Sequence, residues 1–149
     1  MAGFFHADEV LQGAIKIEEN GEELYRSLSE QSDDPVLKEL FTSLADQEVG
    51  HRELFKAMLK KLGQVTLPES YPDEYHEYLK AFAREHVFTA ERKDPRAGLA
   101  IALQAEVDSI LYYLELKNMV PEADKKVVDQ VVEEERRHYL RLLKIKAGK

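Results

Sequence analysis

The feature that most constrains this chain is an internal repeat of two helix-like segments. A shift of 88 positions places Leu11, Ala14, Glu18, Tyr25 and Leu28 on Leu99, Ala102, Glu106, Tyr113 and Leu116. A shift of 87 places Phe41, Leu44, Glu48, His51, Phe55 and Met58 on Val128, Val131, Glu135, His138, Leu142 and Ile145. The matching positions are spaced mainly three, four and seven apart, so each set lies on one face of a helix. The repeat therefore predicts two similar helical hairpins that pack about a pseudo-twofold axis.

Helical periodicity predicts four long helices over residues 7–31, 35–62, 95–118 and 121–147. Asp34 before Pro35 is a cap followed by a proline suited to the first helical position, and Asp94 before Pro95 repeats this signal. The joins within each pair are short, whereas residues 63–94 form a long connection in which we expect a short helix over 72–87. The pattern predicts a single all-α domain over residues 1–149, a four-helix bundle of two antiparallel hairpins with a long crossover that resembles the ferritin-like topology.

Charged residues interrupt the apolar face of every long helix. Glu18 and Glu106 occupy equivalent places in the first helix of each hairpin, and the second helices carry Glu48 with His51 and Glu135 with His138. Buried carboxylates cost several kcal/mol each unless they are paired. Two divalent cations would balance the four negative charges. The sequence has no cysteine, so the ligands would be carboxylates and imidazoles.

This ligand set favours particular metals. One glutamate from each of two helices and a Glu-x-x-His motif from each of the other two is the pattern of two-metal carboxylate sites. Oxygen-rich ligation with one imidazole per metal suits iron or manganese, and zinc usually takes fewer ligands. A single Glu-x-x-His motif in a charged helix usually carries no metal. The two motifs together with the matched glutamates predict a site for two iron ions, with manganese or a mixed pair as alternatives.

Several other residues are weaker candidates. Glu22, one turn after Glu18, is either a further ligand or a base beside the ligands, or else a surface charge. Tyr25 and Tyr113 could donate hydrogen bonds to the ligand carboxylates or could simply be core tyrosines. In the run 133–135 we expect only Glu135 to face inward and the other two glutamates to face solvent. The remaining candidates are assigned to surface, packing or subunit contacts: His6, His76, His86, Tyr75, Tyr78 and Phe82.

Composition excludes several classes of function. The formal net charge of −8 disfavours a nucleic-acid partner, because binding phosphates requires clustered basic side chains. The apolar runs are too short to span a membrane. The first five residues (MAGFF) lack the basic start of a signal peptide, and the acidic residues Asp8 and Glu9 come soon after them. We therefore expect a cytoplasmic protein without a membrane partner.

The motifs as a set resemble the rubrerythrin-like branch of the ferritin superfamily. The resemblance is carried by Glu18 with Tyr25, by the run 48–56 (EVGHRELFK), by Glu106, and by the run 135–138 (ERRH). It implies that Glu48 and Glu135 bridge two irons, that Glu18 and His51 complete one iron, and that Glu106 and His138 complete the other. It also implies an oxidoreductase that reduces hydrogen peroxide, while relatives activate dioxygen or oxidise ferrous iron.

The sequence departs from this family pattern in two places. Rubrerythrins usually carry a four-cysteine rubredoxin module that supplies electrons, and these 149 residues contain no cysteine. Electrons are therefore expected from an external donor protein or from ferrous iron. Rubrerythrins also place a second glutamate three residues from the first in the third helix, where this chain has Leu103 and Ser109. Three functions remain open: a homodimeric di-iron oxidoreductase acting on peroxide or dioxygen, a ferroxidase or iron-handling protein, and a metal-stabilised binding module without turnover.

Overall fold

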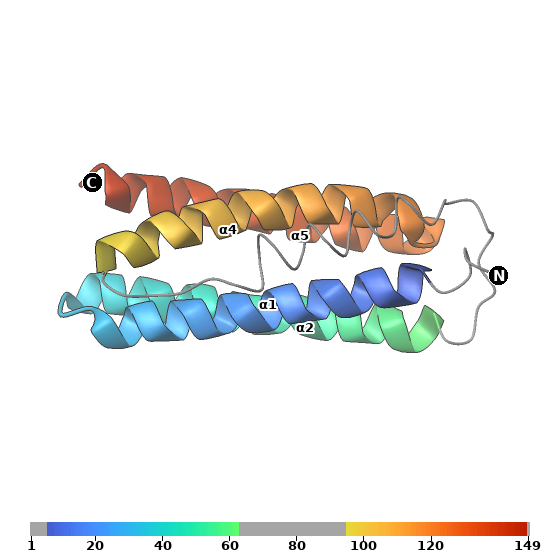
Figure 1. The fold of residues 1–149 in the computed structure, drawn as a ribbon, viewed down its shortest axis with the longest axis horizontal. Coiled ribbons are helices and arrows are strands. Elements are labelled where there is room, and N and C mark those ends of the chain that lie inside the picture. The colour runs from blue at the N-terminus through green and yellow to red at the C-terminus, as the bar shows by residue number, and fades with distance from the viewer. Residues whose placement is uncertain (1–5, 63–94, 149) are drawn as a thin grey trace.

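The computed structural model describes residues 6–62 and 95–148, with side chains from 8 to 62 and from 98 to 148. Within these ranges, four long α-helices run side by side along the length of the molecule (Figure 1). The first hairpin consists of α1 (His6–Gln31) and α2 (Pro35–Leu62). The second consists of α4 (Pro95–Leu116), the 3₁₀ turn η2 (Lys117–Met119) and α5 (Glu122–Lys146). The expected short helix over 72–87, with its aromatic residues and histidines, lies outside the described residues, as does the side chain of His6.

The turn of the first hairpin forms as the sequence predicts. The Asp34 side chain accepts a hydrogen bond from the backbone N–H of Val36 at 2.9 Å, and Pro35 is the first residue of α2. This cap satisfies one of the amides that a helix N-terminus leaves without a partner. The second hairpin differs slightly from expectation. Pro121 precedes α5 in an extended conformation with ψ 153°, and its carbonyl accepts the N–H of Asp124 at 2.9 Å.

The bundle interior consists of two apolar layers separated by a charged layer. On α1 the residues of the first layer end at Ile17 and those of the second begin at Leu24, with Glu18 between them. Along α5 the two layers follow in the same order, and along α2 and α4 they follow in the reverse order. On each of these helices the glutamates and histidines of the repeat lie between the two groups of apolar side chains. The repeat positions therefore face inward as predicted, except that Leu99 and Ile145 near the ends are only partly buried.

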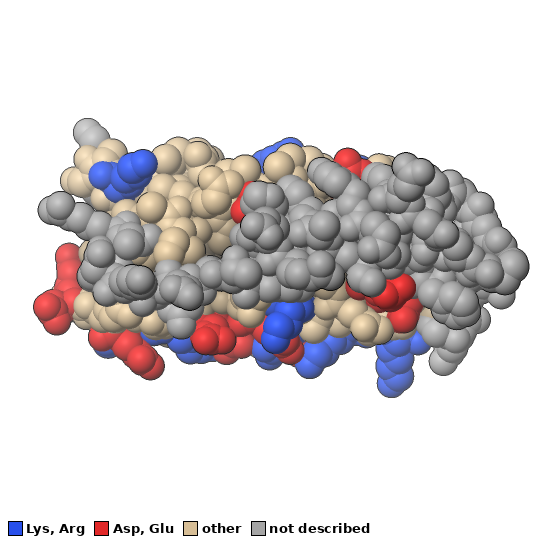
Figure 2. Space-filling model, viewed as in Figure 1, with Lys and Arg blue, Asp and Glu red and all other residues tan. Residues whose placement is uncertain are grey.

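Surface chemistry differs between the two hairpins in one view of the molecule. Lys, Arg, Asp and Glu gather along the edge formed by α1 and α2, whereas other residues dominate the part of α4 and α5 that Figure 2 does not draw in grey. Within residues 6–62 and 95–148, none of the helices has the length and apolar character required to span a membrane. The four helices thus form the predicted ferritin-like bundle and bring the charged layer to the middle of its core.

Candidate metal centre

The structure brings together all six residues that the sequence predicts as metal ligands. α1 supplies Glu18, α2 supplies Glu48 and His51, α4 supplies Glu106, and α5 supplies Glu135 and His138. Each of these residues is at most 3% exposed. They reach one layer because every helix places its charged residue at the same level of the bundle, between the two apolar layers.

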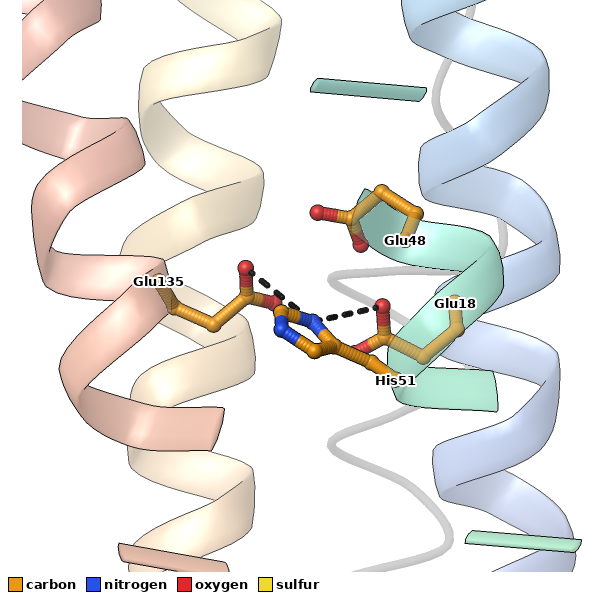
Figure 3. A group of neighbouring side chains, drawn as sticks. All are labelled: Glu18, Glu48, His51 and Glu135. Carbon is orange, nitrogen blue, oxygen red and sulfur yellow. Dashed lines mark ion pairs between the residues drawn. The ribbon is translucent and has the colours of Figure 1, made fainter. Parts of the chain in front are cut away.

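The six side chains form two overlapping groups, each with ligand atoms within 4.8 Å of one another. The first group contains Glu18 and His51, and Figure 3 shows their side chains converging with those of Glu48 and Glu135. The second group combines the same two glutamates with Glu106 and His138. Glu48 and Glu135 thus lie where a carboxylate could contact two metals at once, and each remaining residue belongs to one group only.

Several buried polar atoms of these groups point at one another without a hydrogen-bond partner among the described residues. They are one oxygen each of Glu18 and Glu48, Nδ1 of His51, and both carboxylate oxygens of Glu135. The Nδ1 of His51 lies 3.4 Å from Glu18 and 3.7 Å from Glu135. Buried polar atoms without partners are rare because each costs about 1–3 kcal/mol. Cations between these atoms would remove that cost, so the donor set fits two metal ions.

Each histidine turns one ring nitrogen inward and the other outward. The inward Nδ1 of His138 lies 3.0 Å from Glu135, 3.1 Å from Glu106 and 3.2 Å from Glu48. Its outward Nε2 donates a hydrogen bond to the side-chain oxygen of Gln47 at 2.6 Å. Since that oxygen only accepts, the outer bond keeps a proton on Nε2, so Nδ1 is the nitrogen that would bind a metal once it releases its own proton.

Glu134 plays the corresponding role for the other histidine. The Nε2 of His51 donates to the Glu134 carboxylate at 2.8 Å, and the Glu134 side chain is 28% exposed. The expectation that Glu134 faces solvent is therefore wrong, because the side of α5 next to the inward stripe faces α2 rather than water. Glu134 and Gln47 each directly precede a repeat glutamate and are themselves 87 positions apart. The repeat therefore pairs Gln47 with Glu134, and it could have been used to predict that both bind the outward nitrogens of the histidines.

Two tyrosines hold carboxylates of the opposite hairpin. The Tyr25 hydroxyl on α1 donates to Glu106 on α4, and the Tyr113 hydroxyl on α4 donates to Glu18 on α1. Burial, and after it the neighbouring carboxylates, raise the pKa of both hydroxyls well above 10.0. Both tyrosines therefore remain protonated donors, and the predicted hydrogen bonds to these carboxylates are confirmed.

Without a metal, the charged layer is balanced by protons. Burial alone would lower the pKa of both histidines, but their hydrogen bonds and the negative carboxylates raise it to about 9 for His51 and about 10 for His138. Burial also raises the pKa of Glu48 and Glu106 above the usual value, and the nearby charge of Glu135 adds to this. A metal must therefore displace protons from its own ligands when it binds.

Glu22 lies outside both groups. Its carboxylate forms ion pairs with Arg52 at 2.9 Å and with Arg26 at 3.0 Å. The side chain is 24% exposed. The structure thus places Glu22 among arginines at the edge of the bundle rather than with the ligand atoms.

A small cavity adjoins the ligands between α1 and α4. Its volume is about 20 Å³, which is enough for one water-sized molecule. Glu48, Glu106 and Tyr25 line it together with Gly21 and Ser109, which occupy equivalent places in the repeat. A Cβ atom on Gly21 would lie 2.8 Å from Glu48 Oε2. The cavity therefore depends on small residues on both helices.

The fold and this buried layer define the class of protein. A solved structure from Thermotoga maritima, described as a ferritin-like diiron-carboxylate protein, aligns with a TM-score of 0.72 and 30% sequence identity. The alignment covers 99% of this chain and 98% of that chain. This chain is thus a ferritin-like helical bundle of the diiron-carboxylate type.

The family follows from the sequence match. The family model named Rubrerythrin matches residues 9–146, so the chain belongs to the rubrerythrin family. Among curated proteins, none matches the chain significantly.

Proposed function

We propose that this protein is a di-iron oxidoreductase that reduces hydrogen peroxide or activates dioxygen with electrons from a separate donor protein. The observation that carries the proposal is the pair of overlapping buried groups of ligand atoms. Glu48 and Glu135 would bridge the two irons. Glu18 with His51 would complete one position, and Glu106 with His138 the other.

Two ferrous ions supply the two electrons that, with two protons, convert one hydrogen peroxide molecule into two water molecules. The chain's own residues provide the surroundings for that reaction. Tyr25 and Tyr113 hold the terminal carboxylates in place. The cavity beside Glu48 and Glu106 supports a small substrate, because its volume of about 20 Å³ leaves no room for an organic one.

A second candidate is iron oxidation, in which ferrous iron is the reductant. Within these 149 residues there is no cysteine and so no rubredoxin-type centre, whereas ferrous iron held by the same ligands could itself supply electrons. The two candidates share the same ligands and differ in the source of electrons.

A stopped-flow experiment separates them. Protein loaded anaerobically with two ferrous ions per chain is mixed with hydrogen peroxide or with oxygen. A peroxidase should be oxidised faster by peroxide than by oxygen, should stop after about one peroxide per iron pair, and should resume only when a small electron carrier is added. A ferroxidase should continue with ferrous iron alone and should accumulate more than two irons per chain.

Two variants control for non-specific iron chemistry. Glu106→Ala removes a proposed ligand, and Asp46→Asn removes an exposed carboxylate on α2 that pairs only with Arg26 among the contacts described, at 3.1 Å. Oxidation should be lost or strongly slowed in the first variant and unchanged in the second. If the iron-loaded wild type reacts with neither oxidant, both enzyme proposals are wrong and a metal-stabilised binding module remains.

A further inference from the structure

The two histidines have chemically different outer partners at equivalent positions of the repeat. The inner layer is symmetric, since Glu18 matches Glu106, Glu48 matches Glu135, and His51 matches His138. The side chains that bind the outward nitrogens of the two histidines do not match in this way. His51 donates its Nε2 proton to the carboxylate of Glu134, whereas His138 donates its own to the amide oxygen of Gln47.

The Glu134 carboxylate is fixed in this position from two sides. One oxygen accepts from His51 at 2.8 Å, and the other accepts from the side-chain amide of Gln130, one turn earlier on α5, at 3.3 Å. The shift of 87 positions places Ser43 opposite Gln130. The carboxylate, and the amide that supports it, therefore belong to one half of the site only.

A carboxylate hydrogen-bonded to the far side of an imidazole makes the near nitrogen a stronger metal ligand. The negative charge pulls on the Nε2 proton and raises the electron density at Nδ1. An amide oxygen orients the ring equally well but carries no net charge. The neighbouring Arg52 does not cancel the difference, because it pairs with Glu22 at 2.9 Å.

We infer that the two metal positions are unequal and that the position of Glu18 and His51 binds its metal more tightly than that of Glu106 and His138, because Glu134 rather than Gln47 supports its histidine. This inference rests on the proposed metal site but not on any catalytic activity. Loss of a partner that orients a metal-bound histidine typically weakens binding about 10- to 100-fold. Because Gln47 still orients its ring, we expect the two positions to differ at the lower end of this range, by about tenfold.

The chain offers a complete set of near-isosteric variants for testing this inference. Glu134→Gln gives both histidines an amide partner, and Gln47→Glu gives both a carboxylate. The double variant Glu134→Gln/Gln47→Glu exchanges the two partners. None of the three changes a proposed ligand, and circular dichroism and melting checks that each retains the helical fold.

The probe is Co²⁺ alone, added anaerobically at one equivalent per chain. Anomalous diffraction from crystals grown with this sample compares the occupancy of the two positions, and calorimetric titration measures the two binding steps. In the wild type the position beside His51 should hold most of the cobalt. The two single variants should show nearly equal occupancy, and the exchanged variant should favour the position beside His138.

The outcomes distinguish this inference from the proposed function. Equal occupancy in the wild type would overturn the inference, as would an exchanged variant that still favours the His51 position. Absence of cobalt at both positions would overturn the inference together with the metal site itself. Unequal occupancy that follows the partners, in a protein whose iron form does not react with peroxide or oxygen, would support the inference and reject the proposed function.

Discussion

The metal-free protein should lose stability as pH rises, while the metal-loaded protein should not. The pKa of His51 is raised from 6.5 to about 9 and that of His138 to about 10 in the folded chain. The stabilisation from each protonated histidine is fully present below pH 6.5 and is lost as pH rises through the folded value. Glu48 and Glu106, whose pKa values are also raised, act in the same direction. Between pH 6.5 and about 10 the folded chain therefore holds more protons than the unfolded chain.

The size of the effect follows from these shifts. One pKa unit corresponds to 1.36 kcal/mol, so the shift of His51 alone contributes about 3 kcal/mol to the free energy of unfolding and that of His138 about 5 kcal/mol. The two histidines share the same carboxylates and their contributions overlap, so we expect a total loss of about 5 kcal/mol between pH 6.5 and 10. For a chain of this length that is about 10–20 °C in melting temperature.

Metal binding should oppose this trend. Because metals displace protons from the same ligands, their affinity increases with pH. At a free metal concentration 1,000 times the dissociation constant, the stabilisation is about 4 kcal/mol for each site. The difference in melting temperature between loaded and metal-free protein should therefore widen as pH rises from 6.5 to 9.5.

The assay is thermal melting of chelator-treated and metal-loaded protein across this pH range, with metal content measured in each sample. Glu48→Gln is the informative variant, because it removes a buried carboxylate that needs a counter-charge. Its metal-free form should be more stable than metal-free wild type at pH 8 and should bind metal weakly. A metal-free melting temperature that is constant or rises between pH 6.5 and 9.5 would refute the reasoning.

Three further predictions concern individual residues. Glu135→Ala should reduce metal occupancy at both positions, whereas Glu18→Ala should mainly affect one, as measured by metal analysis; the bridging assignment is wrong if Glu135→Ala leaves one position fully occupied. Tyr113→Phe removes the hydrogen bond to Glu18 and should cost about 1.5–3 kcal/mol in metal affinity or stability, and unchanged cobalt titration and melting curves would contradict this. Gly21→Ala should displace the Glu48 carboxylate, which lies 2.8 Å from the added Cβ, and should slow oxidation of the iron-loaded protein. Gly50→Ala is its control, because nothing lies within 4 Å of that Cβ, and it should raise stability by about 0.5–1 kcal/mol; equal slowing in both variants would exclude the steric explanation.

Local chemistry in the sequence was sufficient to predict the helices and their inward faces. Asp34 and Pro35 determine where α2 begins, and its predicted bounds are those observed. The inward-facing residues of each helix could be predicted because apolar residues recur with the helical period and because the two hairpins repeat the same pattern. The start of α5 was predicted one residue too early, at Pro121, because a proline can occupy either the position before a helix or its first position.

The six buried residues of the two ligand groups were also evident from sequence, for a physical reason. A carboxylate in the middle of an apolar stripe has no solvent-facing alternative once its helix packs, so Glu18 and Glu135 had to face the interior. A folded bundle can bury four such carboxylates at matching positions only if their negative charges are balanced.

Only the tertiary structure decided what the residues beside the stripe do. Glu22 and Glu134 are both glutamates next to an inward position, yet Glu22 pairs with arginines while Glu134 holds His51. Which of them turns inward depends on the rotation of each helix about its axis and on the distance to the neighbouring helix, and the sequence of one helix contains neither quantity. The same interhelical geometry pairs each tyrosine with the carboxylate of the opposite hairpin. The sequence by itself therefore determined the bundle and its buried charges, whereas packing between helices decided the outer partners that make the two halves of the site unequal.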